Sequence, residues 1–403
     1  MICESQTKAR KFTLYQPIIL YRKLIAQQIF NGYQMLPDNS VLIIDRNGTI
    51  VDIVEKADAG EGIEYFKGIL SPGFINCHCH LELSHMKGLI PKHTGLIDFV
   101  MNIVTGRITS NESILQAIEN AELEMMKNGI VAVGDICNTP FTINQKLKKN
   151  LHYQNFIEVS GFPEEVAESR FQKILDIYNQ FKENFSHTSI VPHAPYSVSN
   201  NLLEKIVAFP GNEIITMHNK ETAAENEFFE NKKGDFLKLY EQLNITTSSF
   251  QSKGKSSLQH TLPYFKINKS LILVHNVFTK ESDISYAQTI FSNENAPLYF
   301  CLCPNANLYI SNLLPDVEML VRNNVNIVLG TDSLASNDLL SILDEINTLK
   351  NNFPSLTMIQ LLQWATLNGA RALGIDEKYG SFEKGKTPGV LFIEEGGMRC
   401  VRV

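Results

Sequence analysis

Short apolar runs alternate with amphipathic segments through the middle of the chain. The amphipathic segments repeat apolar residues three and four positions apart, which is the spacing of one face of a helix. They include residues 113–129, 168–185, 316–324 and 339–353. The apolar runs are continuous, as expected of strands that are buried on both faces. Eight such runs cover residues 68–80, 129–136, 151–161, 187–195, 212–219, 270–277, 296–304 and 325–333.

Eight strands alternating with helices predict a (β/α)8 barrel, the TIM-barrel fold, over residues 69–378. The runner-up is a doubly wound open sheet. No G-x-G-x-x-G motif follows any of the strands, which leaves that alternative without its usual dinucleotide-binding signature. We therefore expect one large α/β barrel domain.

Both ends of the chain have a different pattern of short strands and turns. Residues 1–68 and 379–403 are expected to combine into one small β-sandwich domain. The Asn47-Gly48 pair predicts a hairpin with a type I′ turn. The polar stretch 246–261 is expected to be a mobile loop beside the functional face of the barrel.

Composition narrows the range of partners. The chain has 403 residues, of which 44% are hydrophobic, and a net charge of −7. This charge argues against binding to nucleic acid or to an anionic membrane. The chain contains no apolar run long enough to span a bilayer and no recognisable signal peptide, so no membrane association is expected. Seven cysteines, an odd number in a large chain, predict reduced thiols and a cytoplasmic location.

Histidines cluster at the predicted carboxyl ends of the strands, where barrel enzymes carry their chemistry. His78 and His80 share one face of the first strand because side chains alternate along a strand. His193, His218 and His275 end three later strands, and Asp332 ends the last. Three imidazoles and a carboxylate can bind Zn²⁺ or Fe²⁺ with room for a water molecule.

Two further features bear on this set. Glu221 lies three residues after His218 and can carry a proton between a water molecule and a leaving group, although a glutamate at the start of a helix is also common. Cys301 and Cys303 share a strand face and could be thiolate ligands. Because better ligands are present, we interpret them as core residues.

These motifs resemble the amidohydrolase superfamily, in particular its mononuclear metal-dependent deaminase branch. "PGFINCHCH" (72–80) resembles the family's strand 1 motif, and "HAPYSVS" (193–199) its strand 4 motif. "MHNKET" (217–222) is similar to the H-x-x-E of strand 5. "LVHN" (273–276) and "GTDSLASN" (330–337) resemble the motifs of strands 6 and 8.

The resemblance implies residue roles. His78, His80, His218 and Asp332 would bind one divalent metal ion, with Zn²⁺ favoured and Fe²⁺ as the alternative. In addition, Asp332 would have a catalytic role and, with His275, would orient and deprotonate the water. Glu221 would shuttle the proton, and His193 would contact the substrate. Binuclear relatives carry a lysine on strand 4, and the absence of one here favours a single metal.

Two segments depart from the family pattern. Strand 7 has Asn305, Ala306 and Asn307 where the family has Pro-x-Ser-Asn, which bears on the substrate pocket. The tail has "GKTPGVLFI" (385–393) where many relatives have Gly-Lys-x-Ala-Asp, which bears only on the small domain.

The stretch "HLELS" (80–84), together with the environment of Ser333, looks most like the aminodeoxyfutalosine deaminases. These enzymes belong to a route to menaquinone and act on an adenine nucleoside that carries a benzoate-bearing side chain. The resemblance implies that Glu82, Ser84 and Ser333 contact such a small-molecule nucleoside, and a homodimer is left open. The alternatives are a guanine, cytosine or S-adenosylhomocysteine deaminase, a cyclic amide hydrolase, a chlorohydrolase, or a non-catalytic metal-binding barrel.

Overall fold

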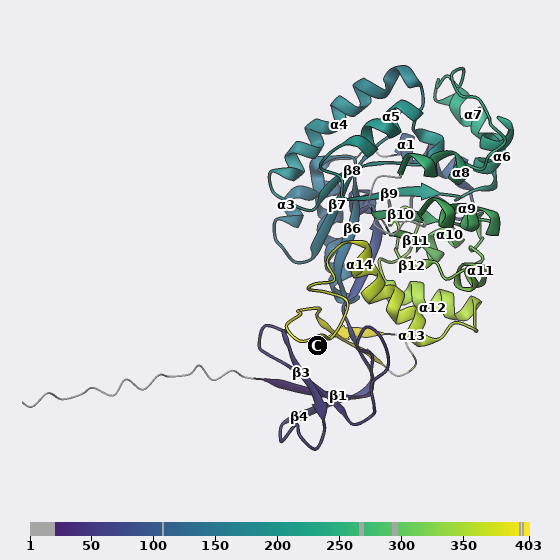
Figure 1. The fold of residues 1–403 in the computed structure, drawn as a ribbon. Coiled ribbons are helices and arrows are strands. Elements are labelled where there is room, and N and C mark those ends of the chain that lie inside the picture. Colours follow the sequence, from purple (N-terminus) through teal and green to yellow (C-terminus); the bar gives the residue numbers. More distant parts are fainter. Residues whose placement is uncertain (1–20, 107–108, 266–269, 292–296, 395, 397–398) are drawn as a thin grey trace, which may run out of the picture.

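The computed structural model describes residues 21–106, 109–265, 270–291, 297–394, 396 and 399–403. All eight predicted barrel strands are present (Figure 1). They are β5 (Phe74–Cys79), β6 (Ile130–Cys137), β7 (His152–Val159), β8 (Thr188–Pro192), β9 (Ile214–Asn219), β10 (Ser270–His275), β11 (Leu298–Leu302) and β12 (Asn326–Leu329). They pair in parallel as two half-sheets, one containing β5 to β8 and the other β9 to β12.

Short contacts between the half-sheets close the barrel at two seams. A parallel bridge joins Cys79 to Asp332, and the carbonyl of His78 accepts bonds from the amides of Thr331 and Asp332 at 3.0 Å each. At the other seam, the amide of His218 donates to the carbonyl of His193 at 2.9 Å. The predicted (β/α)8 barrel is therefore confirmed.

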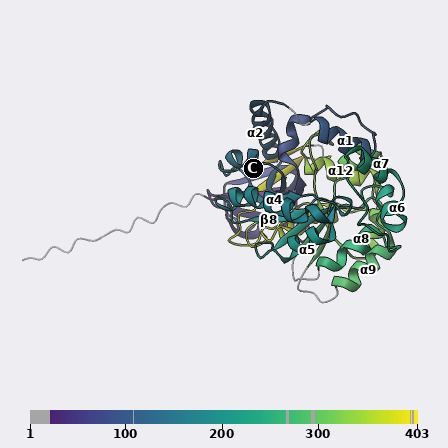
Figure 2. The ribbon, with the colours of Figure 1, turned by 90° about the horizontal axis from the view of Figure 1, so that it is seen from above.

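Helices surround these strands, as the view from above shows (Figure 2). All four predicted helices form, as α2, α4, α11 and α12. The helices are α1 (Leu96–Gly106), α2 (Asn111–Lys127), α3 (Ile143–Lys146), α4 (Ala167–Lys182), α5 (Asn200–Ala208), α6 (Ala223–Asn231), α7 (Asp235–Gln242), α8 (Ser257–Thr261), α9 (Glu281–Phe291), α10 (Pro304–Ser311), α11 (Val317–Arg322), α12 (Ile342–Asn352), α13 (Met358–Gln363) and α14 (Gly369–Ala372). No helix in the described part of the chain is long and apolar enough to cross a membrane.

The small domain is built from both ends of the chain, as predicted, and lies below the barrel in Figure 1. Its strands form one six-stranded mixed sheet in the order β14-β13-β4-β1-β2-β3. They are β1 (Arg22–Ile29), β2 (Ser40–Ile44), β3 (Ile50–Glu55), β4 (Ile63–Pro72), β13 (Val390–Glu394) and β14 (Cys400–Arg402). Because β4 ends only two residues before β5 begins, this domain lies at the amino end of the first barrel strand. The exact boundaries at residues 68 and 379 stay a prediction, and residues 1–20 lie outside the described residues.

The structure corrects two local predictions. The hairpin between β2 and β3 forms, but only Gly48 of its turn has a positive φ (79°), so the turn is not type I′. The carboxylate of Asp45 accepts bonds from the amides of Asn47 and Thr49 and fixes the turn instead. In the stretch 246–261, the second part forms helix α8, and Phe250 is buried against Phe228. The stretch is therefore not a mobile loop along its whole length, because part of it is helical and part packs against α6.

The large core lies between the barrel strands and the helices, and apolar residues of every barrel strand contribute to it or to adjoining clusters. Six cysteines of the described residues are buried and make no disulfide; Cys3 lies outside the described residues. Cys301 and Cys303 belong to the main core cluster. Burial raises the pKa of Cys303 well above its usual value, which keeps the thiol neutral and agrees with a core role.

Candidate active site

Four donor atoms from three strand ends meet at one point. The Nε2 atom of His80 lies 3.2 Å from Nε2 of His78 and 3.3 Å from Nε2 of His218. The Oδ1 atom of Asp332 lies 3.5 Å from Nε2 of His78 and 3.4 Å from Nε2 of His80. All four side chains are buried. The structure thus brings together the residues that the sequence predicted as metal ligands.

The spacing of these atoms suits a metal ion. A tetrahedral site with ligands about 2.0–2.1 Å from the metal has ligand-to-ligand edges of about 3.4 Å, and the four donor-to-donor distances given above lie between 3.2 and 3.5 Å. Imidazole nitrogens and a carboxylate oxygen are also the donors that zinc sites use. His275 is a neighbour of this set, because donor atoms of His78, His218, His275 and Asp332 all lie within 4.8 Å of one another.

Hydrogen bonds orient two of these ligands. His218 donates from Nδ1 to the carbonyl of His193 at 2.7 Å, which leaves its Nε2 lone pair directed at the cluster. Ser336 donates its hydroxyl to Oδ2 of Asp332 at 2.5 Å, so Oδ1 is the oxygen that faces the imidazoles. Asp332 and His275 have left-handed backbones, with φ of 56° and 75°. Such conformations are costly for residues with a Cβ and are common at functional sites.

Burial favours the neutral form of His80, His218 and His275, and the neutral imidazole is the form that binds a metal. Burial lowers the pKa of His80 from 6.5 to about 4 and that of His275 to about 3, and it lowers the pKa of His218 well below the usual value. Asp332 behaves in the opposite way. Burial alone would raise its pKa, but a hydrogen bond from His78 and the neighbouring imidazoles outweigh burial and lower it. The carboxylate therefore stays ionised.

Glu221 and His275 face each other beside the four donors, at 3.6 Å between Oε1 and Nε2. Burial, then the negative charges of Asp332 and Glu225, raise the pKa of Glu221 well above its usual value. A carboxyl group of this kind can hold a proton near neutral pH and release it during a reaction. The other ring nitrogen of His275 accepts a bond from Nδ2 of Asn307 at 2.9 Å. Asn307, in the segment after β11, thus contacts the site directly.

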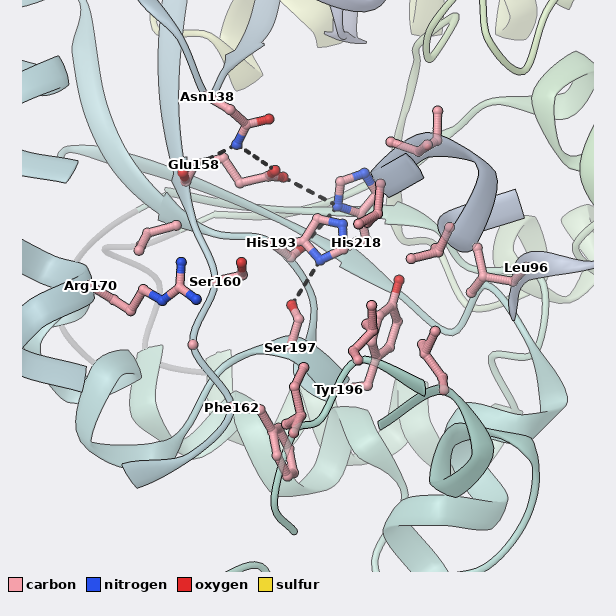
Figure 3. Close-up of a pocket in the computed structure, with 18 of the residues that line it drawn as sticks. Leu96, Asn138, Glu158, Ser160, Phe162, Arg170, His193, Tyr196, Ser197 and His218 are labelled. Carbon is pink, nitrogen blue, oxygen red and sulfur yellow. Dashed lines mark hydrogen bonds and ion pairs between the residues drawn. The ribbon is translucent and has the colours of Figure 1, made fainter. Parts of the chain in front are cut away.

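A cavity of about 760 Å³ opens onto this cluster (Figure 3). His80, His218, Glu221, His275 and Asp332 line its base, and His193 also faces it. Nδ1 of His193 lies 2.8 Å from the hydroxyl of Ser197, which fixes the ring and leaves Nε2 for another partner. Ser333, predicted to contact substrate, lies on the cavity wall as well.

The structure does not bring Glu82 and Ser84 to the cavity. Both lie in the short 3-10 helix Leu81–Met86 and are buried, but neither lines the cavity. Oε2 of Glu82 accepts bonds from the amides of Asn138 and Thr139 at 3.1 and 2.9 Å and from the hydroxyl of Thr139 at 2.7 Å. Glu82 therefore holds the loop after β6, and its carboxylate is engaged in that task.

Glu158 is the site residue that the sequence reasoning missed. It ends β7, lines the cavity, and accepts a bond at Oε2 from Nδ2 of Asn138 at 3.0 Å; its Oε1 lies 3.7 Å from Nδ1 of His218 (Figure 3). The signal was present in "FIEVSG" (156–161), where a charged residue interrupts an apolar strand at its carboxyl end. Glu158, His193 and His218 form a second group of close donor atoms beside the first.

The chain resembles characterised proteins over most of its length. An adenosine deaminase of Helicobacter pylori is 28% identical over 320 residues, which cover 76% of this chain and 75% of the relative. An aminodeoxyfutalosine deaminase of Nitratiruptor is 25% identical over 362 residues, 85% of this chain and 84% of the relative.

The crystal structure of Helicobacter pylori aminofutalosine deaminase in complex with methylthio-coformycin superimposes with a TM-score of 0.76. It covers 93% of this chain and 92% of the other at 23% sequence identity, and so supports the fold. The Amidohydrolase family model matches residues 69–394, which include all eight barrel strands and every residue of the donor cluster. This chain belongs to the amidohydrolase family of hydrolytic enzymes.

Proposed function

We propose that the protein is a metal-dependent hydrolytic deaminase of adenine-type purine nucleosides, with aminodeoxyfutalosine as the favoured substrate. The observation that carries the proposal is the place of Glu221. It is a buried acid that is not one of the four donors, it has a raised pKa, and it lies 3.6 Å from His275 beside the cluster. Hydrolysis of a ring amidine needs such a group, because a ring nitrogen must gain a proton before ammonia can leave.

His78, His80, His218 and Asp332 would hold the metal. When bound there, a Zn²⁺ or Fe²⁺ ion would lower the pKa of a water molecule and so supply a nucleophile near neutral pH. The donor set favours Zn²⁺. The remaining chemistry belongs to the side chains of this chain.

Glu221 carries its proton at a carboxyl oxygen and donates it to the ring nitrogen beside the amino-bearing carbon. His275, whose Nδ1 accepts the bond from Asn307, orients the attacking water, and the ionised carboxylate of Asp332 takes up its proton. The carbon gains a C–O bond; the proton taken up by Asp332 then moves to the amino group, the remaining hydroxyl proton returns to Glu221, and the C–N bond breaks as ammonia leaves. His193, fixed by Ser197, would contact the purine ring.

Glu158 would bind the sugar. Its carboxylate lies on the cavity wall next to His193 and His218, and Asn138 fixes one of its oxygens. A carboxylate can accept bonds from both hydroxyls of a ribose, and a neutral substitute loses this charge-assisted interaction. The proposal therefore moves the sugar contact from Glu82 to Glu158.

Other family reactions use the same ligands. Guanine, cytosine and S-adenosylhomocysteine deaminases, cyclic amide hydrolases and chlorohydrolases are the alternatives, and the product distinguishes most of them. A cytoplasmic location and a homodimer stay predictions. Neither enters the argument for the chemistry.

The test is a substrate panel with the metal-loaded enzyme. Aminodeoxyfutalosine, adenosine, 5′-methylthioadenosine, adenine, guanine and cytosine are each assayed for ammonia and for the absorbance change from adenine to hypoxanthine. We expect turnover of the adenine nucleosides above the free bases. Faster turnover of guanine or cytosine than of every nucleoside would contradict the nucleoside assignment, and chloride release from an aryl chloride without ammonia would favour a chlorohydrolase.

A further inference from the structure

The two ends of the cavity differ in chemistry. Its polar lining residues come mainly from strand ends and the loops after them, around the imidazole cluster. The helices α1, α4 and α7 contribute mostly aliphatic and aromatic side chains, among them Phe99, Ile103, Ile174 and Leu239. A volume of about 760 Å³ lies in the upper half of the range of about 300–1,000 Å³ for small-molecule sites. Much of this apolar space is available to a substituent carried by the nucleoside.

Two cations interrupt the apolar wall. Arg170 and Lys173 lie three residues apart on α4, on the face that also carries Ile174 and Ile177 into the cavity. Figure 3 shows the guanidinium of Arg170 extending from its helix toward Ser160 and the cavity. Among the described residues, neither cation makes a hydrogen bond or an ion pair. Elsewhere on α4, Glu168 is paired with Lys205 at 2.6 Å, so a nearby carboxylate is already engaged.

The distribution of acidic residues is equally uneven. The carboxylates that line the cavity are those of Glu158, Glu221 and Asp332, all at strand ends around the imidazoles. The described residues of α1, α4 and α7 that line the cavity include no acid. A carboxylate at the end of a substituent would meet two cations on this wall, whereas an ammonium group would meet no partner and the same two cations.

We propose that Arg170, assisted by Lys173, is a specificity subsite for a carboxylate at the end of an apolar substituent on the 5′ side of the nucleoside, and that the same wall disfavours an amino-acid substituent. This inference rests on the proposed function and deepens it. Apolar contact with α1, α4 and α7 holds the body of the substituent, and the planar guanidinium of Arg170 binds the carboxylate in a bidentate manner. The absence of an acid explains the rejection, because Arg170 and Lys173, both exposed, would repel an α-ammonium and no carboxylate of this wall would offset the repulsion.

The test compares three adenine nucleosides that share ring and ribose. One carries an aryl carboxylate on its 5′ substituent, the second is the methyl ester of the first, and the third is S-adenosylhomocysteine, which carries an amino-acid group. In the wild-type enzyme we expect a KM for the acid about 10- to 100-fold below that of the ester. We expect S-adenosylhomocysteine to be poorer than the acid. Equal KM values for acid and ester, or a preference for S-adenosylhomocysteine, would overturn the proposal.

Variants of α4 localise the effect. In Arg170→Gln the ratio of the two KM values should fall toward one, and Arg170→Lys should keep part of the preference because it keeps the charge without the planar fork. Lys205→Gln removes a cation of the neighbouring helix α5 that does not line the cavity, and it should keep the wild-type ratio. An Arg170→Gln enzyme that loses acid and ester turnover equally would show a structural role only.

Binding measured separately keeps the two proposals apart. Calorimetry with the metal-loaded Glu221→Gln enzyme compares the affinities of acid and ester without turnover. If the enzyme binds the acid more tightly than the ester and Arg170→Gln removes this difference, the subsite is supported, whether or not any nucleoside is deaminated. If no nucleoside is deaminated, only the proposed function is contradicted. Equal affinities together with deamination of the nucleosides would overturn the subsite and leave the proposed function standing.

Discussion

Glu221 Oε1 and His275 Nε2 lie 3.6 Å apart in a place where both side chains are almost fully enclosed, with 6% and 1% of their surfaces exposed. In the proposed mechanism, Glu221 would therefore release its proton beside the ring that orients the water. Neither residue is one of the four proposed metal ligands, although donor atoms of His275 lie within 4.8 Å of those of three of them.

Replacing Glu221 by Gln keeps the size of the side chain but removes its proton. We expect kcat to fall by about 10²- to 10⁴-fold, the usual contribution of a positioned acid or base, while metal content stays at the wild-type level. Steady-state kinetics and elemental analysis of the same preparation check this. Glu227→Gln is the control, because Glu227 is exposed on the same segment and does not line the cavity. Near-normal turnover by Glu221→Gln would mean that another group moves the proton.

Removing a ligand should release the metal. His78→Ala and Asp332→Ala each take away one of four donors, and we expect the metal content per chain to fall well below one. Elemental analysis after dialysis measures this. His85→Ala serves as the matched control, because His85 is only partly buried and bonds the carbonyl of Glu82 rather than the cluster. Full metal occupancy in both ligand variants would refute the assignment.

Glu82, in the 3-10 helix after β5, and Glu158, near the end of β7, should behave differently when each is changed to Gln. Glu158→Gln should raise KM for adenine nucleosides and leave free adenine less affected, because the sugar loses a charged acceptor. Glu82→Gln weakens the three bonds that hold Asn138 and Thr139, so we expect a loss of about 1–3 kcal/mol in unfolding free energy with a smaller change in KM. A larger rise in the nucleoside KM for Glu82→Gln than for Glu158→Gln would instead indicate that Glu82 contacts the sugar.

Acid should destabilise the protein partly through His152. Burial, then the neighbouring His187 and Lys378, lower the pKa of His152 from 6.5 to about 4. The unfolded chain binds this proton below about pH 6.5 and the folded chain only below about 4, so stability falls as pH decreases across that window. A single such group costs about 2 kcal/mol at pH 5. His152→Leu should reduce the difference in unfolding free energy between pH 7 and pH 5 by that amount, measured with urea. An unchanged difference would exclude His152 as a source.

The spacing of apolar residues along the chain, and the breaks between apolar runs, made the barrel predictable from the sequence. The eight apolar strands, the four clear helices and the union of both chain ends all follow from local patterns that the tertiary structure reinforces. The clustering of His78, His80, His218 and Asp332 was predictable for the same reason, since the carboxyl ends of parallel strands meet at one edge. The place of Glu158 on the cavity wall was not. Glu82 stands next to a ligand in sequence, but loop closure after β6 takes up its carboxylate, whereas Glu158 reaches the cavity from a strand end that carries no recognised motif.

Because the barrel consists of two half-sheets, a bound metal ion would also have a structural role. His78 and His80 belong to the half that contains β5, whereas His218 and Asp332 belong to the half that contains β9 and β12. An ion held by all four residues would link the two half-sheets. The seams that it would connect are the one at the Cys79–Asp332 bridge and the one at the His193–His218 hydrogen bond. Its binding free energy would then oppose separation of the halves. Without the ion, the first seam keeps its backbone bonds and the Asn76–Thr331 side-chain bond, and the shared apolar core still joins the halves, so the ion would add to these contacts.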